Sequence, residues 1–177
     1  MAKSSTQSDR PPLQQLQTVV DLLETPSLAR IYAYILQNGP TTVSTVISEL
    51  DIPQGTAYDY IHKLEVADLV KKTHNERPYR YDAEPISLTL STDGHTQTIT
   101  PALIAAVARR ESDEDVDVYL ERHGLDGLAT ALEYADEYVE GTVNHRIAAR
   151  ELDLSPLEAE IILQALEPVI AEYALEE

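Results

Sequence analysis

Two short amphipathic segments meet at a sharp break in the first half of the chain. In residues 42–50, apolar side chains recur at spacings of three and four, which is typical of one face of a helix: Val43, Val46, Ile47 and Leu50. Asp51-Ile52-Pro53 ends this helix, because proline cannot continue a helix interior but fits the first turn of a new one. A second helix is predicted over residues 53–67, with a buried stripe of Ala57, Tyr60, Ile61 and Leu64.

The segment after this helix pair predicts a β-hairpin. Residues 69–73 (LVKKT) favour a strand, residues 74–76 a tip, and residues 77–81 (RPYRY) a return strand. The outward side of the second helix is polar and presents Gln54, Thr56, Tyr58, Asp59, His62 and Lys63. The sequence therefore predicts helix, turn, helix and hairpin in that order.

This order resembles the winged helix-turn-helix of the ArsR, MarR and TrmB-type transcriptional regulators. The likeness covers roughly residues 26–83 and is carried by the motifs Glu49-Leu50-Asp51-Ile52, 56–60 (TAYDY), 62–65 (HKLE) and 67–70 (ADLV). It implies that the second helix enters the major groove of DNA and that the hairpin, or wing, lies near the minor groove. It also implies a mostly α fold with a small β wing, followed here by a C-terminal helical domain.

The resemblance assigns roles to individual side chains. Base edges would be faced by Gln54, Thr56, Tyr58, Asp59 and His62, phosphates by Lys63, Lys71 and Lys72, and the minor groove by Arg77 or Arg80. Gln54 suits adenine and Asp59 suits cytosine N4. Because Asp59 is unfavourable beside phosphates, it must face bases or pair with Lys63 four residues later. Each of these residues could instead lie on an ordinary solvated face.

The charge of the chain is unusual for a DNA-binding protein. It has 31 acidic and 13 basic residues, a net charge of -18, whereas DNA-binding domains are typically basic. Lysine is scarce, and cysteine, tryptophan and phenylalanine are absent. This composition resembles that of proteins from extremely halophilic archaea. At about 1 M salt the screening length is roughly 3 Å, so long-range repulsion from DNA is nearly removed and close contacts must provide affinity.

Local charge therefore matters more than net charge. Residues 60–81 contain five basic and three acidic residues, a net charge of +2, and hold three of the four lysines in the chain. Residues 133–177 contain two basic and twelve acidic residues, a net charge of -10. The basic strip coincides with the proposed DNA-facing segment, although a few basic residues also scatter by chance on any surface.

The remaining sequence suggests four parts. Residues 1–12 are polar and proline-containing and are expected to form a disordered tail, and residues 13–83 to form the winged domain with helices over 13–24 and 26–37. Asp93-Gly94 predicts a hairpin within residues 84–100, connecting the winged domain to the rest. Residues 101–177 are expected to be helical, to support dimerisation and to offer a place for a small effector. Leu13–Glu24 lies outside a minimal winged domain and is expected to contact a second subunit.

Helix boundaries in the last part follow from caps and breakers. Helices are expected over residues 101–111, from a Ser112 cap to Gly124, and over residues 125–140, 142–152 and 156–175, the last kinked at Pro168. Residues 150–156 (RELDLSP) repeat the pattern of residues 48–53 (SELDIP) and could mark another helix-turn-helix. The helix that follows is acidic on its polar side, which favours packing against a partner over DNA binding. Burial within its own subunit is the alternative.

The sequence offers little for catalysis. Its five histidines never pair with metal-ligand spacing, and there is no phosphate-cradling glycine loop or thiol. We therefore expect no enzyme, metal or cofactor. Residues 1–12 lack the apolar core of a signal peptide, and no run approaches the roughly 20 apolar residues of a membrane span, so a soluble cytoplasmic protein is expected.

The sequence as a whole predicts a regulator that binds double-stranded DNA sequence-specifically as a homodimer in a high-salt cytoplasm. The competing interpretation is a protein-interaction adaptor that uses the winged fold without binding DNA.

Overall fold

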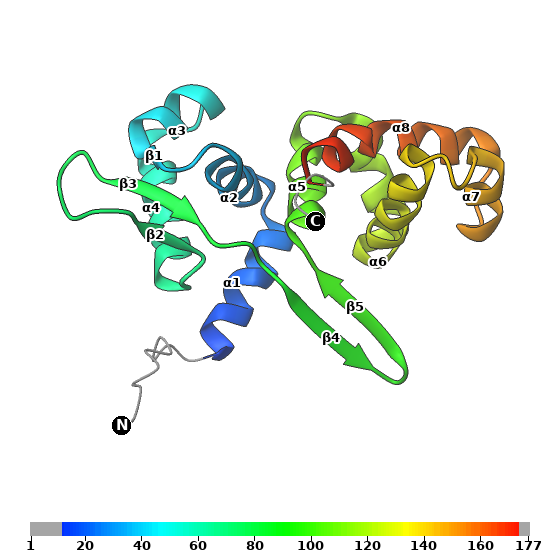
Figure 1. The fold of residues 1–177 in the computed structure, drawn as a ribbon, viewed down its shortest axis with the longest axis horizontal. Coiled ribbons are helices and arrows are strands. Elements are labelled where there is room, and N and C mark those ends of the chain that lie inside the picture. The colour runs from blue at the N-terminus through cyan, green and yellow to red at the C-terminus, as the bar shows by residue number, and fades with distance from the viewer. Residues whose placement is uncertain (1–11, 174–177) are drawn as a thin grey trace. The chain divides into compact units, whose positions relative to one another are not determined.

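The computed structural model describes residues 12–173 (Figure 1). The chain divides into two compact units, an N-terminal unit (residues 1–85) and a C-terminal unit (residues 86–177). The tail expected over residues 1–12 lies outside the described residues except for Pro12, which already belongs to the first helix.

The N-terminal unit is built on a set of packed helices and a small sheet. Its helices are α1 (Pro12–Glu24), α2 (Pro26–Asn38), α3 (Val43–Leu50) and α4 (Gln54–Val66). Apolar side chains from all of them form the core, including the fully buried Leu22, Ile31, Tyr32, Val46 and Leu64. The apolar spacing in residues 13–24 predicts a buried stripe of Leu16, Val19, Val20 and Leu23. This is partly wrong, because the buried residues of α1 are Thr18, Val19 and Leu22, whereas Val20 is 42% exposed.

The sheet of this unit contains β1 (Thr41–Thr42), β2 (Val70–Lys72) and β3 (Arg80–Ala83) in the order β1-β3-β2. The return strand thus begins at Arg80 and not at Arg77 as predicted, which leaves residues 73–79 as the wing loop. Pro78 explains the difference, because a residue without an N–H cannot donate to the strand ladder. After the wing, the hydroxyl of Tyr32 donates to the carbonyl of Glu84 at 2.6 Å and fixes the chain against α2.

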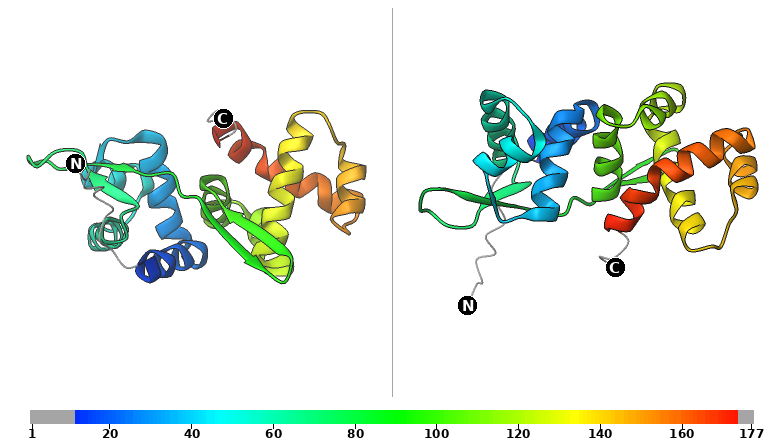
Figure 2. Two further views of the ribbon diagram at one scale, coloured as in Figure 1. Left: turned by 60° about the horizontal axis from the view of Figure 1, so that its bottom comes forward. Right: turned by 90° about the horizontal axis from the view of Figure 1, so that it is seen from above.

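The C-terminal unit begins with a two-stranded hairpin, β4 (Leu88–Thr92) and β5 (His95–Ile99). The turn residues Asp93 and Gly94 both have positive φ, 46° and 83°, as a tight hairpin turn requires. Helices follow as α5 (Pro101–Ala108), a 3₁₀ turn (Arg109–Glu111), α6 (Glu114–Val139), α7 (His145–Glu151) and α8 (Pro156–Tyr173). Figure 2 shows α6 and α8 packed together, with α7 beside the start of α8.

Several predicted boundaries in this unit need correction. Asp113, not Ser112, caps α6, because its carboxylate accepts from the N–H groups of Asp115 and Val116 at 3.1 and 3.4 Å. The predicted break at Gly124 is present as one non-helical residue, with φ 69° and ψ -174°, inside α6. The next helix begins at His145 instead of residue 142, since the Asn144 side chain is the cap.

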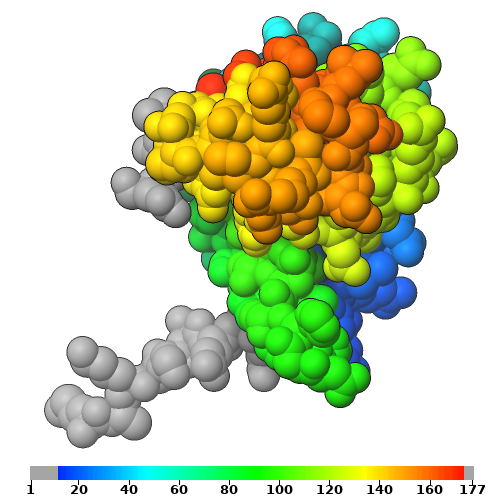
Figure 3. All heavy atoms as spheres, turned by 90° about the vertical axis from the view of Figure 1, so that its right-hand side faces the viewer, coloured from blue at the N-terminus to red at the C-terminus, as the bar shows by residue number. Residues whose placement is uncertain are grey.

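Helix α8 has the expected cap. The Ser155 hydroxyl accepts from the N–H of Glu158 at 3.2 Å, and the Glu158 carboxylate accepts in return from the N–H of Ser155 at 3.4 Å. Its apolar side is buried inside its own unit, which corrects the preference for partner packing; the buried residues include Ile162, Leu163, Leu166 and Val169. Figure 3 shows the surface formed by α7 and the first part of α8.

The repeated sequence pattern produces the same backbone turn in both units. Asp51 after α3 and Asp153 after α7 are left-handed, with φ 52° and 54°. The next residue in each case donates its N–H to the carbonyl five residues earlier, from Ile52 at 3.4 Å and from Leu154 at 2.8 Å. This helix C-terminal motif places a buried or partly buried apolar side chain just before the following helix.

Within residues 12–173, no group of three or more His, Cys, Asp and Glu side chains is arranged to hold a metal ion. None of the helices in that range combines the length and apolarity needed to cross a membrane.

Candidate nucleic-acid interface

Helix α4 presents most of its predicted DNA-facing side chains to solvent. It is anchored by Ala57, Ile61 and Leu64, which are all buried, whereas Tyr60 of the predicted stripe is only partly buried. On the opposite side, Gln54, Tyr58, Asp59, His62 and Lys63 are exposed, and Thr56 is partly exposed. Because Arg30 donates to the carbonyl of Leu50 at 3.0 Å, α2 also fixes the end of α3 just before the turn into α4.

The wing is organised around Tyr79, a residue that the sequence analysis did not single out. The ammonium of Lys72 lies 4.3 Å from the centre of its ring, and the guanidinium of Arg77 lies 5.6 Å from it. Both distances are within the range of cation–π attraction. Tyr79 therefore holds a cation from β2 and a cation from the wing loop close together.

A groove opens between the wing, α4 and the start of α3. It has a volume of about 820 Å³ and is lined by Thr42, Val43, Ser44, Tyr58, Arg77, Pro78, Tyr79 and Tyr81. Arg77 supplies its cation, while threonine, serine and tyrosine side chains can supply hydroxyl groups. Helix α3 also begins here, and the N-terminal end of a helix favours anions. The groove thus combines groups suited to a phosphate.

Tyr81, which is buried, also lines this groove, and the pKa of its phenol is raised. Burial, followed by the negative charge of Glu65, raises the pKa of its phenol above the ordinary value of 10.0. A protonated phenol can donate a hydrogen bond to an anion, whereas a phenolate would repel it. The pKa shift therefore favours the donor form.

The predicted phosphate-binding lysines are already paired within the chain. Lys63 contacts Asp21 of α1 at 2.6 Å, Lys71 contacts Glu84 at 3.6 Å, and Lys72 contacts Glu65 at 3.9 Å. The alternative that Lys63 pairs with Asp59 is therefore wrong. Within the described part of the chain, the side chains of Arg77 and Arg80 have no carboxylate in ion-pair contact.

The structure brings part of the predicted set together. Tyr58 shares the groove with Arg77, and His62 shares a second depression, of about 360 Å³, with Lys71 and Lys72. Lys63 instead turns toward α1 through its pair with Asp21. The predicted residues therefore divide into those that lie near the wing and Lys63, which lies near α1.

Sequence reasoning missed Ser44, Tyr79 and Tyr81 as groove residues. One signal was available, because the segment RPYRY interleaves arginine with tyrosine, a pattern suited to nucleic-acid contacts. Ser44 gave no such signal, since its position depends on how the start of α3 meets the wing.

Comparison with known families agrees with this geometry. Residues 25–87 match the family model described as sugar-specific transcriptional regulator TrmB. The N-terminal unit carries a TrmB-type winged helix-turn-helix domain. The match runs from the residue before α2 to the residue before β4, so the TrmB-type domain includes α3, α4 and the whole wing. The predicted fold, a winged helix-turn-helix with C-terminal helices, is confirmed.

The rest of the chain carries a different match. Residues 110–174 match a family of unknown function, DUF7437. This match covers α6, α7 and α8 and excludes the TrmB-type domain. Searches of curated proteins and of solved structures gave no match.

Proposed function

We propose that this chain is a transcription regulator that binds double-stranded DNA sequence-specifically, as a homodimer, in a high-salt cytoplasm, without enzymatic activity. The observation that carries the proposal is the groove in which Arg77, Tyr58 and the start of α3 come together within a TrmB-type domain. A duplex contacted by both α4 and the wing would place a backbone phosphate near this groove. Arg77 suits that position because its guanidinium can bind phosphate oxygens bidentately.

The remaining roles follow from position on the domain. The proposed base-facing residues are Gln54, Thr56, Tyr58, Asp59 and His62. The three lysines would release the carboxylates with which they are paired and contact phosphates instead; they are Lys63, Lys71 and Lys72. Arg80 and Arg77 would act from the wing. Because each surface ion pair is worth only about 0.2–1 kcal/mol, this exchange costs little.

The acidic composition supports binding at high salt. A protein with a net charge of -18 is repelled by DNA unless the field is screened. In molar salt, close contacts such as the Arg77 and tyrosine groups of the groove persist, because screening acts mainly over longer distances. We therefore expect specific affinity to survive salt concentrations that weaken ordinary DNA-binding proteins.

The exposed side of α1 supports dimerisation. Leu13 is 76% and Val20 is 42% exposed, and the partly exposed Leu16 and Leu23 continue the same row. Spacings of three and four are those of a helix that packs against another helix. Residues 11–20 also carry no charge, so two acidic chains can approach along this side with little repulsion. A two-fold dimer would read half-sites about 34 Å apart, or a multiple of that distance.

The test is selection of duplex fragments in molar KCl, followed by titration of an enriched duplex with variants. Arg77→Ala and Lys72→Ala should each weaken binding without lowering thermal stability. Arg146→Ala is the matched control, since it removes an exposed arginine of the C-terminal unit. Sedimentation of the DNA complex should give two chains per duplex site. Equal affinity of all the variants, or no enriched sequence, would contradict the proposal.

One observation favours the second candidate, an adaptor that does not bind DNA. Three of the cations proposed to face DNA are already neutralised by carboxylates of the same chain. If selection retains no duplex while the chain captures a defined protein partner, the winged surface serves protein recognition. Loss of that capture in Arg77→Ala would then locate the contact.

A further inference from the structure

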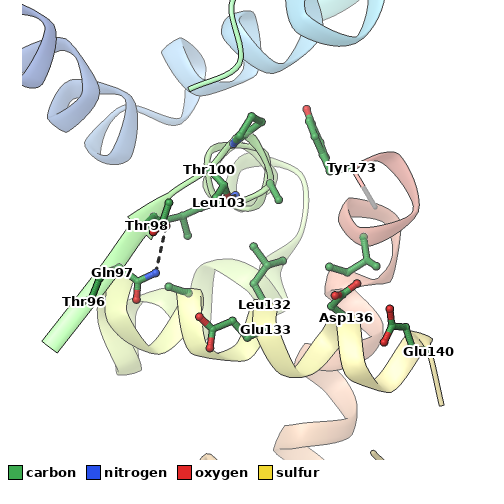
Figure 4. Close-up of a pocket in the computed structure, with 14 residues that line it drawn as sticks. Thr96, Gln97, Thr98, Thr100, Leu103, Leu132, Glu133, Asp136, Glu140 and Tyr173 are labelled. Atoms are coloured by element: carbon green, nitrogen blue, oxygen red, sulfur yellow. Dashed lines mark hydrogen bonds between the residues drawn. The ribbon is translucent and has the colours of Figure 1, made fainter. Parts of the chain in front are cut away.

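A cavity of the C-terminal unit has features that the proposed DNA interface does not use. It has a volume of about 460 Å³, which is the size of a small-molecule site. Four elements of this unit surround it, namely β5, α5, α6 and α8 (Figure 4). Its lining belongs entirely to residues 96–173, so the cavity is formed without any part of the TrmB-type domain.

The cavity combines an apolar floor with a polar wall. Leu103, Leu132 and Ile170, which are all buried in the unit, contribute the floor. The wall is formed by β5, where Gln97 donates to the carbonyl of Thr98 at 3.3 Å and holds its amide in place. Such a surface suits a ligand with methylene groups and a few polar atoms.

Three carboxylates at the C-terminal end of α6 give the cavity one sign of charge. Glu133 and Asp136 belong to α6 and Glu140 is its C-cap residue. They are three and four residues apart, so they lie along one side of this end of the helix, as Figure 4 shows. Their backbone positions are separated by about 4.5 Å and about 6 Å along the helix axis. In the described residues, no lysine, arginine or histidine lines the cavity, and none forms an ion pair with these carboxylates.

The Tyr173 ring completes the lining from α8. The face of an aromatic ring attracts cations and does not repel methylene groups. Carboxylates and an aromatic ring above an apolar floor are together a recognition surface for an organic cation. A single metal ion fits less well, since no described group of carboxylates converges on a common point.

We propose that this cavity binds a linear aliphatic polyamine. Ammonium groups separated by three or four methylenes lie about 5–6 Å apart in an extended chain, close to the spacing of the carboxylates along α6. The ammonium groups pair with Glu133, Asp136 and Glu140, and the methylenes lie on Leu132 and its apolar neighbours. An anion is repelled by the same carboxylates, and a neutral sugar leaves them without charge compensation. This site does not depend on the proposed DNA binding.

Calorimetric titration of the full chain with spermidine in molar KCl, without DNA, tests the proposal. The cavity variant is Glu133→Gln with Asp136→Asn, and Glu140→Gln is a second, milder variant. The matched control is Glu121→Gln with Asp126→Asn, which removes the same charge from exposed positions of α6 outside the cavity. We expect saturable binding that weakens at least about tenfold in the cavity variant, and less than about twofold in the control.

Each other outcome overturns the proposal. Equal weakening in the cavity and control variants would mean that spermidine acts only as a counterion of an acidic surface. Glucose binding as tightly as spermidine would mean a polyol site, and no saturable binding of spermidine would mean no site of this class. Circular dichroism of both double variants verifies that the helices are intact, and the Glu140→Gln result decides the matter if the cavity variant is unfolded.

Discussion

The ring of Tyr79 is expected to set the affinity of the wing for DNA by holding two cations in place. At 4.3 Å the Lys72 contact is close and at 5.6 Å the Arg77 contact is near the outer limit of about 6 Å. Exposed cation–π contacts contribute about 0.5–1 kcal/mol each, so the pair together is worth about 1–2 kcal/mol. Tyr79→Leu keeps an apolar side chain but removes the aromatic face, and should therefore weaken DNA binding about 5–30-fold.

Fluorescence anisotropy with a selected duplex in molar KCl measures this change. Tyr79→Phe is the matched variant, because it keeps the ring and removes only the hydroxyl, so its affinity should stay within about twofold of the wild type. If the ring acts through the two cations, the loss of affinity in Tyr79→Leu must depend on the presence of Lys72 and Arg77. Tyr79→Leu should accordingly have a much smaller effect when Lys72 and Arg77 are already alanine.

Two results would refute this reasoning. If Tyr79→Phe weakens binding as much as Tyr79→Leu, the hydroxyl and not the ring makes the contact. If the effect of Tyr79→Leu is unchanged in the Lys72→Ala and Arg77→Ala background, the ring acts on DNA directly, for example by stacking, and not through the cations.

Two further predictions concern stability and are measured by thermal melts. Gly39→Ala should destabilise the N-terminal unit by about 1–3 kcal/mol, because a Cβ there would lie 2.6 Å from the backbone carbonyl oxygen of Ile35. Gly55→Ala is the control and should not destabilise the unit, because its Cβ would meet nothing within 4 Å. A similar loss of stability in both variants would contradict the predicted clash. Hydrogen bonds from Ser155 lower the pKa of Glu158 in the folded state below its ordinary value of 4.5. The charged carboxylate therefore stabilises the fold fully above about pH 4.5, and this stabilisation is lost as the pH falls through the pKa of the folded state. The melting-temperature difference between wild type and Glu158→Gln should thus be largest near neutral pH and shrink below about pH 4, and a difference independent of pH would refute the assignment.

Helix positions in both units could be predicted because local sequence determines them. Pro53 and the apolar spacing around it locate α3 and α4, and Ser155 with Glu158 locates the start of α8. Two errors in helix starts of the C-terminal unit occurred where neighbouring residues could serve the same local role. Asp113 replaces Ser112 as a cap, and the side chain of Asn144 starts α7 later than expected. Propensity alone does not distinguish such neighbours, since both types accept N–H groups well.

The candidate site was harder to predict because it depends on contacts between distant segments. The exposure of α4 follows from its periodicity, so Gln54, Tyr58 and His62 could be placed on the outer side. The pair between Lys63 and Asp21 could not, because the two residues are far apart in sequence and meet only in the folded unit. The groove formed by Ser44 and Arg77 depends in the same way on a contact between α3 and the wing loop.

The ion pairs change how the basic strip should be interpreted. A net charge of +2 over residues 60–81 suggested a cationic surface, yet Lys63 and Lys71 are paired with carboxylates from outside that segment. The field that DNA would meet is therefore weaker than the sequence count implies. What distinguishes the groove is its chemistry at short range, namely a guanidinium, several hydroxyls and the start of a helix. Contacts of this kind remain effective when salt has screened the long-range field. On so acidic a chain, the proposed DNA binding is therefore expected to depend on Arg77 and its neighbours more than on the lysines.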